Sequence, residues 1–174
     1  MSPHPLELWS LANLPKWLAC ALSLLVRLAA SCLFAISFLA AILITRAVWQ
    51  ADWPLHRYDA LVIIALGLQA LFIATKLETL EEARVILIFH LTGSMMEWFK
   101  VSAGSWAYPE PGLLKLFGVP LFTGFMYASV GSTIARALRL FEIRLAPAPP
   151  YWAIATLAVA IYVNFWSHHY LPDA

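Results

Sequence analysis

Charged residues are scarce in this chain. Lys, Arg, Asp and Glu make up 12% of the sequence, whereas a soluble domain carries about 25%. Hydrophobic residues make up 62%, and the mean hydropathy is +0.77. So few charges cannot cover a water-soluble globule of this size. The composition therefore predicts a protein that has the lipid bilayer as its solvent.

Cysteine and basic clusters are also rare. Cys20 and Cys32 are the two cysteines, and both lie in apolar sequence without metal-ligand spacing. We expect two small buried side chains rather than a disulfide or a catalytic thiol. The net charge is +1 and the basic residues are scattered, which argues against nucleic acid as a partner. No Gly-rich phosphate loop, nucleophile elbow or His-Glu-x-x-His pattern occurs.

Long apolar stretches alternate with charged or proline-rich segments, which predicts an all-α polytopic membrane bundle of about five transmembrane helices. The predicted spans are residues 28–46, 60–76, 83–103, 113–135 and 151–167, which together make a transmembrane bundle of residues 28–174. Residues 1–27 are expected to form a cytoplasmic or interfacial N-terminal segment. Pro120 is expected to bend the fourth span. Glu78 and Glu82 are expected in a solvated helical turn between the second and third spans.

The distribution of positive charge predicts the orientation. The N-terminal segment and the second and fourth connections hold Lys16, Arg27, Lys76, Arg84, Arg136, Arg139 and Arg144. The opposite side holds Arg46, Arg57, Lys100 and Lys115. The side with more Lys and Arg faces the cytoplasm, so we expect a cytoplasmic N-terminus.

The third predicted span carries an unusual set of polar residues. Helical spacing places His90, Gly93, Glu97 and Lys100 on one face. A charged carboxylate at bilayer depth costs roughly 2.5–3.5 kcal/mol, so it needs a partner, a proton or water. One hypothesis is a polar pocket in which Glu97 carries protons, binds a metal or anchors a substrate. The other is a structural pair between Glu97 and Lys100 that holds helices together.

Several aromatic and small residues accompany Glu97. Trp106, Tyr108 and Tyr127 are candidate ligand-binding residues beside it, and His90 and Lys100 are further catalytic candidates. The alternatives are an interfacial aromatic belt for Trp106 and Tyr108, and an interhelical hydrogen bond for Tyr127. His90 could equally be a core histidine bonded to backbone or a hydroxyl. A four-residue repeat of small residues at Gly124, Ala128 and Ser132 predicts close helix packing.

A cluster near the end of the chain has metal-ligand chemistry. His168, His169 and Asp173 offer the imidazole and carboxylate groups that suit zinc, iron or manganese. Adjacent histidines on a regular helix point about 100° apart, so the spacing does not specify a metal site. The alternative is a polar cap at the membrane interface. The sequence does not identify a cofactor.

Four motifs resemble a known family. They are Met96–Lys100, Gly104–Glu110, Gly118–Ser132 and Asn164–Tyr170 with Asp173, and together they resemble the bacterial membrane family numbered 817 among the domains of unknown function. The resemblance covers roughly residues 60–174 and implies a location in the bacterial inner membrane. Members of that family look longer, with further helices beyond His169. We therefore expect a shorter member, and either a homo-oligomer or a missing C-terminal half would complete its pocket.

Four functions remain open at this point. The site around Glu97 could bind a small or lipidic ligand. It could belong to a membrane enzyme acting on a lipid or isoprenoid, with Glu97 as acid or base and the histidines as metal or proton partners. It could couple protons to transport, in a transporter or half-transporter. The chain could also be a scaffold.

Overall fold

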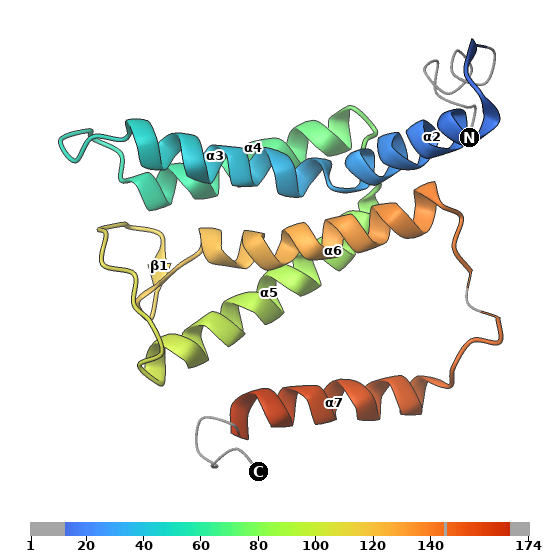
Figure 1. Ribbon diagram of the computed structural model, residues 1–174. Helices are drawn as coiled ribbons and strands as arrows, with labels where there is room; N and C mark the ends of the chain where they lie inside the picture. Colours follow the sequence, from blue (N-terminus) through green and yellow to red (C-terminus); the bar gives the residue numbers. More distant parts are fainter. Residues whose placement is uncertain (1–12, 145, 168–174) are drawn as a thin grey trace. The chain divides into compact units, whose positions relative to one another are not determined.

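The structure is a computed structural model that describes residues 13–144 and 146–167 (Figure 1). The chain divides into two compact units after Glu142. The first contains α2 (Lys16–Ser31), α3 (Leu33–Val48), α4 (Arg57–Ala74), α5 (Leu80–Ser102), β1 (Lys115–Leu116), β2 (Val119–Pro120) and α6 (Phe122–Leu140). The second contains α7 (Tyr151–Ser167). The predicted all-α class is confirmed, since the strands of the described segments form one short hairpin.

Few of the described helices meet the length and hydropathy expected of a membrane span. Among the described helices, α4 is by itself long and apolar enough to cross a membrane. Helices α2 and α3 qualify only as a pair, and a break bends this pair by 60°. Helix α7 is apolar but has 17 residues. Five spans are therefore not confirmed, because α5 and α6 are long enough but rich in polar side chains.

Aromatic residues from three helices form the core of the first unit. The rings of Phe34 and Phe38 on α3 lie 6.1 Å apart. Phe72 of α4 meets Phe34 edge-on at 6.0 Å, and Phe125 of α6 meets Phe38 at 6.2 Å. Edge-to-face contacts of this kind add to the stabilisation from burying the rings. The core therefore joins α3, α4 and α6.

Small residues allow α5 and α6 to pack closely. A Cβ atom added to Gly93 would overlap the ring of Tyr127, and one added to Gly124 would overlap Ser94 and His90. Ala128 and Ser132 on the same face of α6 are fully buried. The predicted packing face of α6 thus lies against neighbouring helices, and Gly93 provides the matching space on α5.

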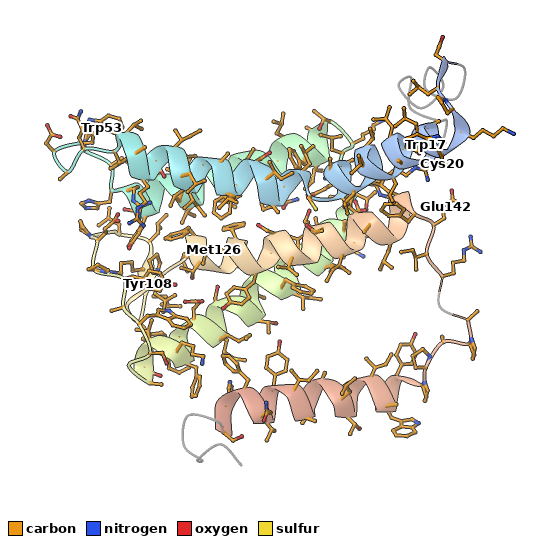
Figure 2. All side chains as sticks on the ribbon, in the orientation of Figure 1. Trp17, Cys20, Trp53, Tyr108, Met126 and Glu142 are labelled. Carbon is orange, nitrogen blue, oxygen red and sulfur yellow. The ribbon has the colours of Figure 1, made fainter. Side chains whose placement is uncertain are left out.

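Large apolar side chains cover the outside of the first unit (Figure 2). Examples from five helices are Trp17, Leu39, Leu66, Leu91 and Ile134, all of which are exposed. Each of these five helices therefore carries large apolar side chains on its exposed side.

The first and fourth predicted spans need correction. The helical segment of the first begins at Lys16 rather than near residue 28, and Cys32 interrupts it. Cys20 is exposed rather than buried, because it lies on the outer side of α2. Phe117 and Gly118 have φ angles of 51° and 84° and form the two-residue turn of the hairpin. Pro120 lies in β2, so it precedes α6 and does not bend it.

Candidate functional site

The C-terminal end of α5 turns the chain back on the helix. The Ser105 N–H donates to the Lys100 carbonyl at 3.0 Å, and the Gly104 N–H donates to the Val101 carbonyl at 3.1 Å. Gly104 has a φ of 72°. These bonds and the left-handed glycine form a Schellman motif. The loop that follows can therefore place its side chains beside the last turns of α5.

Glu97 accepts three hydrogen bonds from aromatic side chains. The Trp106 Nε1–H and the Tyr108 hydroxyl donate to its Oε2 at 3.0 and 2.6 Å. The Tyr127 hydroxyl donates to Oε1 at 2.8 Å. Glu97 is only 3% exposed, and hydrogen bonds to a charged group contribute about 1.5–3 kcal/mol each. The three donors offset much of the cost of burying this carboxylate.

The donors reach Glu97 from two directions. Tyr127 extends from α6, whereas Trp106 and Tyr108 come from the loop after α5. Burial raises the pKa of the Tyr108 phenol above its ordinary value, and its hydrogen bond to Glu97 raises the pKa further. Tyr108 therefore remains a protonated donor at neutral pH. Trp106 is still 43% exposed, so one side of the site is close to the surface.

Lys100 lies one helical turn beyond Glu97 and is also buried. Its Nζ atom is 5.9 Å from the centroid of the Trp106 ring, within the range of a cation–π interaction. The structure thus brings Glu97, Lys100, Trp106, Tyr108 and Tyr127 together. The direct pairing of Glu97 with Lys100 stays a prediction.

The loop that carries Trp106 and Tyr108 is also held by α4. Asp59 is buried in the first turn of α4 and accepts the N–H groups of Leu113 and Leu114 at 2.9 and 2.7 Å. Arg57 binds Glu110 through two hydrogen bonds of 2.8 and 2.6 Å. In the sequence, Arg57 and Asp59 fall in the connection between the first two predicted spans, and these contacts were not predicted. The available signal was a carboxylate in the first turn of an apolar helix, a position that favours acidic residues.

His90 and Ser94 are further polar residues of α5, one to two turns before Glu97. Both face Gly124 of α6, and the His90 ring lies 4.4 Å from that of Phe125. Within the described part of the chain, His90 Nδ1 and Ser94 Oγ are buried without a hydrogen-bond partner. Buried polar atoms are seldom left unpaired, so this interface has unused hydrogen-bonding capacity.

The metal hypothesis is not tested by the structure. His168, His169 and Asp173 lie outside the described residues. Among residues 13–144 and 146–167, no three His, Cys, Asp or Glu side chains are close enough together to hold a metal ion.

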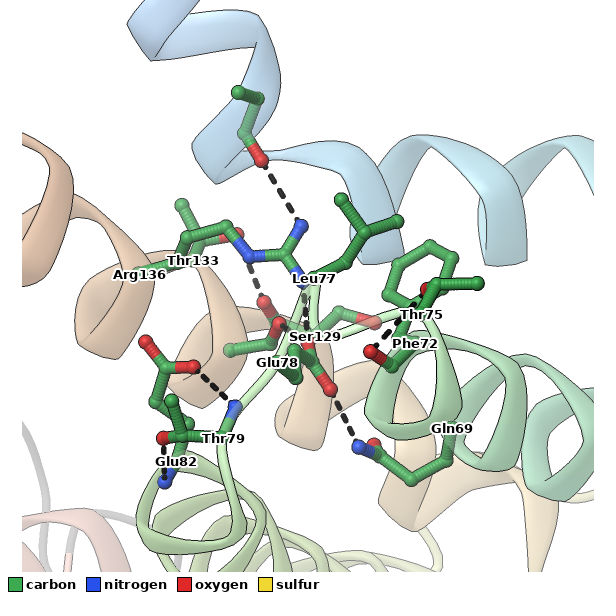
Figure 3. A network of polar contacts seen from close by, with 12 residues as sticks. Gln69, Phe72, Thr75, Leu77, Glu78, Thr79, Glu82, Ser129, Thr133 and Arg136 are labelled. Atoms are coloured by element: carbon green, nitrogen blue, oxygen red, sulfur yellow. Dashed lines mark hydrogen bonds and ion pairs between the residues drawn. The ribbon is translucent and has the colours of Figure 1, made fainter. Parts of the chain in front are cut away.

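A second polar network joins α4, the connection between α4 and α5, and α6 around Glu78 (Figure 3). Glu78 and Arg136 are each 2% exposed, and Arg136 Nη2 lies 3.1 Å from Glu78 Oε1. Gln69 and Ser132 donate hydrogen bonds to the same carboxylate. Arg136 Nη1 also donates to the Ala30 carbonyl of α2 at 3.0 Å, beside the break before α3.

The segment around Glu78 is therefore not a solvated turn. Glu82 is also buried: it forms a capping box with Thr79 at the start of α5 and pairs with Arg139 at 2.7 Å. Tertiary packing buries both carboxylates because α6 supplies an arginine for each. Sequence reasoning had assigned these arginines only to the count of cytoplasmic charges.

Removing one hydroxyl from the Glu97 site should weaken the fold measurably. Tyr127→Phe keeps the ring but deletes a hydrogen bond to a buried carboxylate, so we expect a loss of about 1.5–3 kcal/mol in unfolding free energy. Tyr151→Phe is the matched control, because Tyr151 is exposed. Equilibrium unfolding in detergent micelles would measure both, and equal stabilities would refute the importance of this hydrogen bond.

Comparison with known proteins gives a relative and a family. The uncharacterized protein YoaT of Bacillus subtilis (strain 168) is 46% identical over 145 residues, which are 83% of this chain and 54% of the relative. The chain thus spans about half the length of the curated relative it matches. No solved structure matches it. The family model described as "Protein of unknown function (DUF817)" matches residues 7–174. The chain therefore belongs to the DUF817 family.

Proposed function

We propose that this chain is an integral membrane protein of the bacterial inner membrane that binds a small or lipidic ligand at the Glu97 site. The exposed apolar side chains on all helices of the first unit support a lipid environment. The apolar helix α4 and the apolar pair α2–α3 support it further. The modest excess of positive charge on one side supports a cytoplasmic N-terminus.

The observation that carries the ligand proposal is the buried Glu97 carboxylate with its three aromatic donors. A buried carboxylate in a membrane protein is expensive and often marks a functional site. Two of its donors belong to a loop, and Trp106 is partly exposed, so a ligand can reach Glu97 by displacing a side chain of this loop. The ligand group would be a hydrogen-bond donor, such as a hydroxyl or an amine.

The proposal can be tested with the protein purified in mild detergent. We expect a compound to copurify with the wild type and to be lost from Glu97→Gln, because the neutral amide binds a donor group less strongly. Glu81→Gln is the control, since Glu81 is exposed on the same helix. Mass spectrometry of the extracted compounds provides the measurement. Equal retention by wild type and Glu97→Gln, with both folded, would refute the proposal.

The same variants separate binding from the other functions. Chemical conversion of the copurified compound by the wild type, but not by Glu97→Gln, would indicate an enzyme acting on a lipid or isoprenoid. Proton-coupled flux in reconstituted vesicles that disappears in Glu97→Gln would indicate a transporter. In either case the ligand would still use Glu97.

A further inference from the structure

A cavity lies at the junction of α3 and α4. It has a volume of about 240 Å³ and is lined by the last turn of α3, the connection to α4, the first residue of α4 and the Glu110 segment. Its charged and aromatic lining residues are Arg46, Trp49, Trp53, His56, Arg57 and Glu110. The apolar core does not contribute to it, and Glu97 does not line it.

The lining carries an excess of positive charge. Arg57 is paired with Glu110 through two of its five N–H groups. Arg46 has no acidic partner within the part of the chain that the structure describes. With the Arg57–Glu110 pair neutral overall, Arg46 gives the cavity one net positive charge.

The N-terminus of α4 adds to the positive electrostatic potential of the cavity. His56 is the N-cap residue of α4 and makes no side-chain capping hydrogen bond. Helix N-termini carry a partial positive charge and free N–H groups, which favour anions. Asp59 in the first turn of α4 opposes this contribution, so the excess positive charge of the lining comes from Arg46, and an anion is the ligand that the cavity favours.

Two tryptophans make the walls of the cavity amphipathic. The Trp49 and Trp53 rings meet edge-on at 4.7 Å, and Trp49 Nε1 donates to the Leu55 carbonyl at 3.2 Å. Tryptophan beside arginine is typical of the interface between a membrane and water. An anion bound here would have apolar rings on one side and guanidinium groups on the other.

We propose that this cavity binds a singly charged phosphate group, as found in the phosphodiester headgroup of a phospholipid and in the monoanion of inorganic phosphate. Guanidinium groups match the geometry of phosphate oxygens. One negative charge would balance Arg46. This proposal does not depend on the Glu97 site, so Glu97→Gln should bind phosphate as the wild type does.

Calorimetric titration of the full chain in nonionic detergent tests the proposal, with dihexanoyl phosphatidylglycerol and inorganic phosphate as separate probes. Binding of the short-chain lipid alone assigns the site to a lipid headgroup, and equal binding of both assigns it to free phosphate. Arg46→Ala should weaken binding about tenfold, because a charge-assisted hydrogen bond is lost. Arg46→Lys, which keeps the charge, should restore part of the affinity.

Arg84→Ala serves as the matched control, because Arg84 is an exposed arginine on α5 and does not line the cavity. It should bind the probes as tightly as the wild type. The proposal is overturned if neither probe binds the wild type. It is also overturned if Arg46→Ala and Arg84→Ala bind equally well.

Discussion

Replacing Arg136 by methionine is expected to lower the free energy of unfolding by about 3–5 kcal/mol, because it leaves the buried Glu78 carboxylate without its cation. Both side chains are 2% exposed, and their charged atoms lie 3.1 Å apart. The substitution also removes the donor of the Ala30 carbonyl at the α2–α3 break. Equilibrium unfolding of the purified protein in mixed micelles would measure the loss.

A double substitution distinguishes the ion pair from simple packing. In Glu78→Gln with Arg136→Met no buried charge is left unpaired, so the double variant should regain at least about 2 kcal/mol relative to Arg136→Met alone. Arg84→Met is the control at an exposed arginine. If Arg136→Met is no less stable than Arg84→Met, the buried pair does not stabilise the fold.

Gly93→Ala is expected to reduce the unfolding free energy by about 3 kcal/mol, through overpacking and the loss of a hydrogen bond. The new methyl group would overlap the Tyr127 ring. Tyr127 would then have to move away from Glu97, to which its hydroxyl donates at 2.8 Å. The same change should therefore also weaken ligand retention at the Glu97 site.

Gly67→Ala provides a close comparison for this variant. Gly67 lies within α4, and an added Cβ would meet no atom within 4 Å. Alanine favours helices over glycine by about 1 kcal/mol, so this variant should be as stable as the wild type or more so. Thermal unfolding of Gly93→Ala and Gly67→Ala would measure the difference in their stabilities. Equal stability of both would show that α5 and α6 are not in close contact at Gly93.

The residues of the Glu97 site could be predicted because each had a local signal. Glu97 and Lys100 are charged residues in an apolar helical stretch, and Trp106, Tyr108 and Tyr127 belong to motifs near it. Their arrangement could not be predicted. The sequence left open whether Trp106 and Tyr108 lie beside Glu97 or in an interfacial belt, and whether Glu97 pairs with Lys100. The Schellman turn at Gly104 places the two loop donors at the carboxylate.

Helix positions were largely determined by the sequence itself, because apolar length and proline breaks act locally. The last helix was expected at residues 151–167 and is found at Tyr151–Ser167. Only the tertiary structure decided which charges are buried. Glu78, Asp59 and Arg136 lie outside the predicted spans in the sequence, yet each is buried with partners from distant segments. A charged side chain can be buried only where another helix or loop supplies its counterpart, and that depends on which segments meet in space.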